Sequence, residues 1–102
     1  MSPIKSGKFQ VIADVPDTVS VSGTLNFATA ANALTAMRNA FAKHDRHTLD
    51  LGGVESCDSA GLACVLAALS EADQGGRRVN VRHVPEGMQA LAQVCGVESL
   101  LH

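Results

Sequence analysis

The chain has 102 residues, of which 46% are hydrophobic and 18% are charged, and its formal net charge is −2. This predicts one globular domain over residues 1–102, with residues 1–7 as a loose tail. An aromatic content of 3% and scattered basic residues argue against a nucleic-acid partner. No apolar run is long enough for membrane insertion. Three cysteines and an N-terminus without an apolar leader favour reduced thiols in the cytoplasm.

The first two strands are expected to form a hairpin. Apolar and polar residues alternate over residues 9–13 and again over residues 18–22, with turn chemistry between them. Gly23 is expected to end the second strand.

A helix is predicted next, with Asn26 as its cap and an end near Lys43. Apolar residues recur there at helical spacing and predict one core face: Phe27, Ala30, Ala31, Leu34, Met37 and Phe41.

The central stretch predicts a strand over residues 48–51, a turn at Gly52-Gly53, and a helix that begins at Ser59. Asp58 has the residue type that caps a helix, because its carboxylate can accept from backbone N–H groups one turn inward. A hydroxyl at Ser59 would then lie near exposed N–H donors, where it could carry a phosphate or meet a partner. The simpler alternative is that both residues only cap the helix.

The central helix is predicted over residues 59–73 and ends before Gly75-Gly76. Its expected core stripe is Leu62, Val65, Leu66 and Leu69. Most of its remaining surface is small, which allows another helix to approach closely from this chain or from a partner.

A further strand is predicted around Val79 and Val81, followed by a last helix from Pro85 to Gly96 and a closing segment at residues 97–101. The expected inward residues of that helix are Met88, Leu91, Ala92 and Cys95. The order predicts an α/β fold with a mixed sheet of four to five strands. Because the strands alternate, the helices should lie mainly on one face, in two layers.

The residues offer little catalytic chemistry. The glycine pairs lack a phosphate-binding context, and the histidines show no metal-ligand spacing with the cysteines. Cys57 has no evident histidine partner, and a general-acid pair of Glu55 and Asp58 would need burial. We therefore expect neither an enzyme nor a metal or other cofactor.

Residues 48–66 resemble the signature of the STAS domain family, with Asp58-Ser59-Ala60-Gly61-Leu62 at its helix. Residues 23–26 are similar to the family's lead into the first helix, and residues 75–79 and 91–97 match later landmarks. The resemblance covers nearly the whole chain and implies the STAS fold.

The resemblance implies two competing roles, both non-enzymatic. Residues 22–30 and 59–63 look most like the STAS subunit of Mla-type phospholipid ABC transporters. That subunit docks on the ATPase and supports outer-membrane lipid asymmetry, so this chain would be cytoplasmic and peripheral to the inner membrane. The alternative is an anti-sigma-factor antagonist whose partner kinase phosphorylates the serine, here Ser59. Ala60 and Asn26 depart from the antagonist pattern.

In both roles the candidate contact surface surrounds the start of the central helix. Its predicted members are Asn26, Glu55, Asp58, Ser59, Ala60, Gly61 and Ala63. A phosphate on Ser59 would place charge beside Asp58, so it should weaken an apolar contact there. A nucleotide or other small-ligand binder on the same fold is a third possibility.

Overall fold

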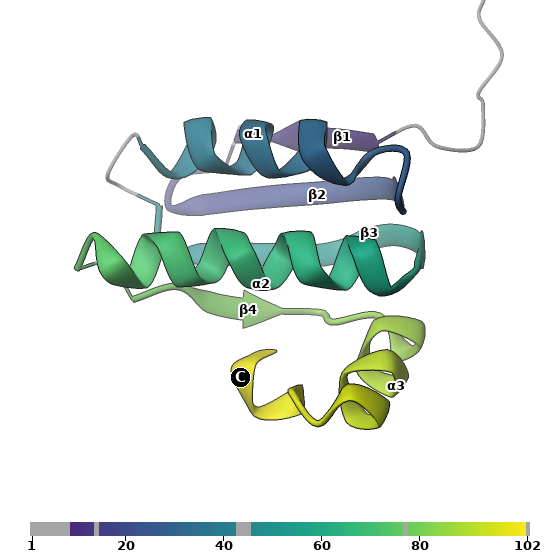
Figure 1. The fold of residues 1–102 in the computed structure, drawn as a ribbon. Helices are drawn as coiled ribbons and strands as arrows, with labels where there is room; N and C mark the ends of the chain where they lie inside the picture. Colours follow the sequence, from purple (N-terminus) through teal and green to yellow (C-terminus); the bar gives the residue numbers. More distant parts are fainter. Residues whose placement is uncertain (1–8, 14, 43–45, 77, 102) are drawn as a thin grey trace, which may run out of the picture.

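The computed structural model describes residues 9–13, 15–42, 46–76 and 78–101. The predicted loose tail, the predicted helix end at Lys43 and the last residue therefore lie outside the described residues. The elements, in chain order (Figure 1), are β1 (Phe9–Ile12), β2 (Thr18–Leu25), α1 (Ala30–Phe41), β3 (Thr48–Cys57), α2 (Ser59–Gln74), β4 (Asn80–Arg82), α3 (Glu86–Cys95) and a 3-10 helix, η1 (Glu98–Leu101).

The strands form a four-stranded mixed sheet in the order β1-β2-β3-β4. β1 pairs with β2 antiparallel, whereas β2, β3 and β4 are parallel and are linked through α1 and α2. Figure 1 shows α1 and α2 side by side over one face of the sheet, with α3 beyond β4. The predicted α/β fold, with helices mainly on one face, is confirmed.

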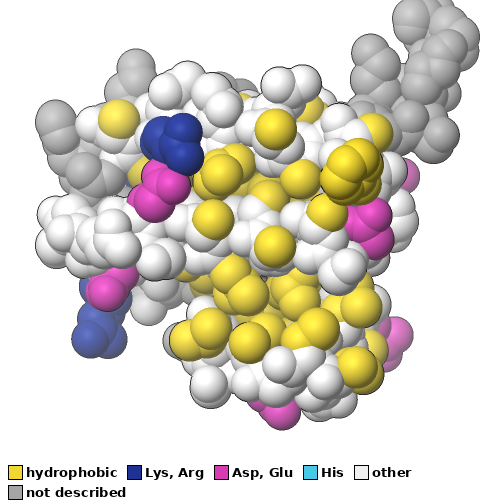
Figure 2. Space-filling model, in the orientation of Figure 1, with side chains coloured by type: hydrophobic (Ala, Val, Ile, Leu, Met, Phe, Trp, Pro, Cys, Tyr) yellow, Lys and Arg dark blue, Asp and Glu magenta, His cyan; other side chains and the backbone are white. Residues whose placement is uncertain are grey.

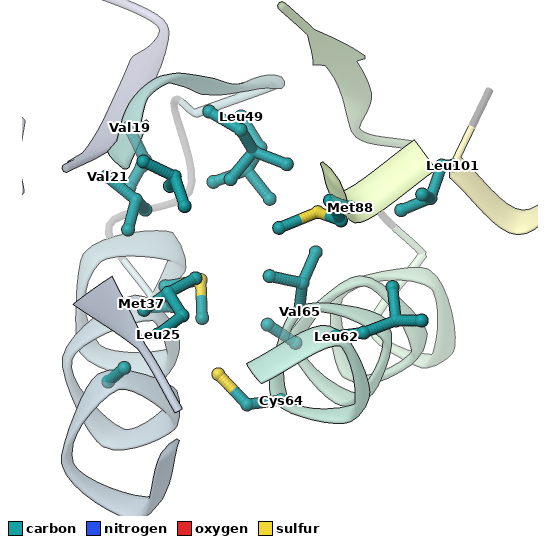
Figure 3. Packing of buried hydrophobic residues seen from close by; sticks show 14 of the residues in the cluster. Val19, Val21, Leu25, Met37, Leu49, Leu62, Cys64, Val65, Met88 and Leu101 are labelled. Carbon is teal, nitrogen blue, oxygen red and sulfur yellow. The ribbon is translucent and has the colours of Figure 1, made fainter. Parts of the chain in front are cut away.

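The core lies between the sheet and the helices, and its side chains come from both layers (Figure 3). Every second residue of a strand points toward the helices, so Val19 and Val21 of β2 pack with Leu49 and Leu51 of β3. The residues between them point to the outer face of the sheet and include polar side chains such as Ser20, Asp50 and Arg82 on adjacent strands. This alternation is the sequence pattern expected of a sheet covered on one side.

Two strands are longer than predicted because glycines lie inside them. Gly23 does not end β2, and Gly52-Gly53 is not a turn, since β3 continues to Cys57. A Cβ on Gly53 would come within 2.6 Å of the Ser22 Cβ, so the strands approach there closely enough to require glycine. The β2–β3 register shifts between Ser20 and Ser22, which fits an irregularity at glycine.

The first helix begins later than predicted, at Ala30. This shortens the apolar face: Met37 and Phe41 are buried as expected, but Phe27 precedes the helix and is 86% exposed. Ala31 is also exposed, and Ala33 is buried in its place. The predicted core face was therefore correct for Ala30, Leu34, Met37 and Phe41 and wrong for Phe27 and Ala31.

The other helices follow the prediction closely. α2 begins at Ser59, and α3 follows Pro85 and is capped at its end by Gly96, whose φ of 74° is the left-handed conformation that glycine favours. Met88, Ala92 and the closing residue Leu101 are buried. Two expectations were wrong: Cys95 is exposed, and the buried side of α2 is broader than one stripe, since it includes Cys64, Ala68 and Ala72.

The three thiols should differ in reactivity. Burial raises the pKa of Cys64 to about 11, and burial together with the neighbouring Asp58 carboxylate raises the pKa of Cys57 to about 11, whereas Cys95 is exposed. Because the thiolate is the reactive form, Cys95 should react with a thiol reagent at pH 8 roughly tenfold or more faster than the other two. Replacing Cys95 with serine should abolish the fast phase. A fast phase that persists in Cys95→Ser would contradict this assignment.

Candidate functional site

The candidate site lies where β3 ends and α2 begins. Asp58 has an extended backbone, and its carboxylate Oδ1 accepts from the Gly61 N–H at 3.0 Å, which confirms the predicted helix cap. The Asp58 N–H donates to the Leu25 carbonyl at 3.1 Å. The residue therefore fixes the first turn of α2 to the end of β2.

The same carboxylate also holds the loop that precedes α1. Its Oδ2 accepts from the Phe27 N–H at 3.1 Å, across 31 positions of sequence. Hydrogen bonds from backbone N–H groups, chiefly that of Gly61, lower the pKa of Asp58 below its usual value. Asp58 is thus a fixed negative charge between two loops.

Asn26 and Thr29 stabilise that loop reciprocally. The Asn26 side-chain oxygen accepts from the N–H groups of Ala28 and Thr29, at 2.9 and 3.1 Å. The Thr29 hydroxyl accepts from the Asn26 N–H and donates to the Thr24 carbonyl. Asn26 therefore caps a turn before α1, rather than the helix itself, and this turn delays the helix to Ala30.

Gly61 brings α2 against the strand layer of its own chain. A Cβ at this position would lie 2.2 Å from the Leu25 carbonyl oxygen, a contact that no side chain could make. The predicted close approach therefore occurs within the domain.

The structure brings the predicted site residues to one end of the molecule, with different exposure. Ser59 is the first residue of α2 and is exposed. The exposed members are Glu55, Asp58, Ser59 and Ala63; Asn26 and Ala60 are half-buried, and Gly61 is buried.

Two residues of this end were not among the predicted site residues. Phe27 was predicted to be in the core, yet it lies beside Asp58 with its ring in solvent. Thr29 is buried and holds the turn. The Asn-x-x-Thr spacing could have indicated the reciprocal turn, as in a capping box. Periodicity alone could not indicate that Phe27 precedes the helix.

The hollowed surface lies away from this end. A groove of about 420 Å³ runs between the later part of α2 and the segment before β4, and it is lined by Leu66, Leu69, Ser70, Asp73, Arg78, Val79, Asn80 and Leu100. Figure 2 shows hydrophobic side chains gathered between α2 and α3.

The described part of the chain has no group of three His, Cys, Asp or Glu side chains that could hold a metal ion. Its helices are each too short or too polar to cross a membrane.

A family model described as "Mlab, STAS domain" matches residues 9–102. The chain belongs to the STAS domain family. This confirms the resemblance on which the fold was predicted. No curated protein matches the chain.

Solved structures show the same fold at low sequence identity. The phosphorylated form of the Bacillus cell fate determinant SpoIIAA is 18% identical over 91% of this chain and 87% of that one, with a TM-score of 0.65. The unphosphorylated anti-sigma factor antagonist SpoIIAA has a TM-score of 0.68, at 18% identity over 91% and 84% of the two chains. SLC26A9 is 17% identical over 87% of this chain and 18% of that one, with a TM-score of 0.59.

Adding a methyl group at Gly61 should displace α2 from β2. We expect Gly61→Ala to lower the free energy of unfolding by about 2 kcal/mol or more, because the added Cβ meets a backbone carbonyl. Gly87→Ala is the matched control, since nothing lies within 4 Å of its added Cβ. In that helix the change should be neutral or stabilise by up to about 1 kcal/mol. Equal stability of the two variants in urea denaturation would contradict the close approach.

The Asp58 cap should make stability depend on acid pH. The folded pKa of Asp58 is lowered, so its stabilising effect is fully present above the unfolded pKa of about 4 and is lost as the pH falls through the folded value. Asp58→Ala should therefore lower the melting temperature at pH 7, and the difference from wild type should shrink below about pH 4. A difference that stays constant from pH 7 to pH 2 would show that the carboxylate charge is not involved.

Proposed function

We propose that this protein is a non-enzymatic STAS subunit that binds, and regulates or stabilises, the ATPase of an Mla-type phospholipid ABC transporter. Such a transporter maintains outer-membrane lipid asymmetry, and the subunit would be cytoplasmic and held at the inner membrane by its partner. The observation that carries the proposal is the family match, whose description names Mlab and which spans every described residue.

The geometry of the site favours binding over chemistry. Its hydroxyl, Ser59, is exposed and lies on a helix whose neighbouring surface includes the small residues Ala60 and Ala63. Its carboxylate, Asp58, is already engaged by two backbone N–H groups. A general acid or base must be free to exchange a proton with substrate, whereas a capping carboxylate is held in its ionised form.

The second candidate is an anti-sigma-factor antagonist, whose partner would be an anti-sigma serine kinase. The observation that favours it is the structural likeness to SpoIIAA, which has been solved in phosphorylated and unphosphorylated forms. Ser59 begins α2, where exposed N–H groups and the helix dipole would offset part of a phosphate's charge by about 0.3–1 kcal/mol. The adjacent Asp58 would oppose that charge.

Both candidates predict that charge at Ser59 weakens the complex. Ser59→Asp should lower the affinity for the cognate ATPase by about tenfold or more, because an apolar contact would leave the added charge without water. Ser70→Asp, also exposed and on the same helix, is the matched control and should bind within about twofold of wild type. Isothermal titration of each purified variant with the ATPase gives the comparison.

The same titration separates the two candidates. Binding to the ATPase that is lost in Ser59→Arg supports the transporter subunit. If the chain does not bind the ATPase but binds an anti-sigma kinase, which then phosphorylates Ser59, its function is that of an anti-sigma-factor antagonist. If Ser59→Asp binds as tightly as wild type, the candidate site is not the interface.

A further inference from the structure

Phe27 is held rigidly at the candidate site with its ring in solvent. It is 86% exposed, the highest value among the exposed large hydrophobic residues that the structure describes. Its N–H donates to the Asp58 carboxylate, and the next N–H, of Ala28, donates to the Asn26 side chain. The backbone on both sides of the ring is therefore fixed before any partner arrives, which lowers the entropy lost on binding.

The charged side chains that the structure describes at this end are acidic. The carboxyl ends of β2 and β3 lie at the same edge of the sheet, where Leu25 pairs with Cys57, together with the starts of α1 and α2. Residues 24–30 and 54–62, which form this end, contain Glu55 and Asp58 but no lysine or arginine. Figure 2 shows hydrophobic and acidic side chains next to each other where α1 and α2 begin.

We propose that Phe27 is the anchor of the partner interface and inserts into an apolar pocket of the partner protein that is framed by lysine or arginine side chains. The inference rests on the proposed function: the apolar part of the pocket covers Phe27 and Ser59, and the basic side chains lie at its rim. Large aromatic side chains that become fully buried carry most of the energy of many interfaces. Basic side chains at the rim complement Glu55 and accelerate association.

The charge of this surface also disfavours a second copy of this chain as the partner that binds there. A symmetric dimer through this end would bring the same acidic residues of two copies together. Like charges that face each other across an interface are unfavourable, and no lysine or arginine of these two segments could compensate them.

The first test is the affinity of Phe27→Ala for the cognate Mla-type ATPase and, in parallel, for an anti-sigma kinase of the same organism. The variant should fold as wild type, because the ring is exposed and the Phe27 N–H is retained. We expect it to weaken binding about 30-fold or more. Val94→Ala, in which an 85% exposed side chain on α3 is shortened, is the control and should bind within about twofold of wild type.

The second test concerns the basic frame. Glu55→Lys should slow association with the partner, and raising the salt concentration should slow association of the wild type. Glu98→Lys, an exposed change of the same charge on η1, is the control for a general effect of net charge. Equal slowing by both lysine variants would overturn the basic frame.

The outcomes distinguish the two levels of the proposal. If Ser59→Arg abolishes binding to the ATPase but Phe27→Ala binds within about twofold of wild type, the function stands and the anchor is wrong. Loss of kinase binding in Phe27→Ala, without any binding to the ATPase, would support the anchor and overturn the transporter function. Binding of the wild type to neither protein would overturn both. A wild-type dimer that Phe27→Ala dissociates, with unchanged partner affinity, would identify a second copy as the occupant.

Discussion

The contact between the start of α2 and the end of β2 positions the residues of the candidate site. The Leu25 carbonyl accepts from the Asp58 N–H, and the space beside its oxygen is free only because residue 61 is glycine. This contact places the Asp58 carboxylate between two loops, where it satisfies the N–H groups of Gly61 and Phe27. The position of Ser59 is therefore determined by backbone packing and not by its own side chain.

Asp58 performs a structural task that limits its use in recognition. Its two oxygens are directed at backbone donors, so the side chain could turn toward a partner only by leaving N–H groups unpaired. A partner consequently meets it as a fixed charge, and the other contacts with the partner must come from its neighbours. Exposed Ser59 and Phe27 are such neighbours, one polar and one apolar. Their nearness suggests how a single modification could change a largely apolar contact.

The sequence allowed the order of the elements, the Asp58 cap and much of the core to be predicted, because these depend on local periodicity and capping chemistry. Val19, Leu49 and Met88 are buried as their spacing requires. The errors had two causes, one long-range and one local. Gly53 looked like a turn residue, but long-range packing places it in β3 against Ser22. Phe27 fitted a helical face that starts three residues later, after the turn between Asn26 and Thr29. The family motif predicted which residues form the site. Their arrangement depends on the contact between α2 and β2, which the motif does not reveal.

The shortness of the outer strands has a consequence for self-association. β1 and β4 form the two edges of the sheet and have four and three residues, whereas the inner strands have eight and ten. An exposed edge offers unpaired backbone groups on which another chain can add a strand, and short edges offer few of them. Short edges therefore disfavour the addition of strands from other copies and the growth of fibrils. A specific complex would instead form through the side chains at the starts of the helices.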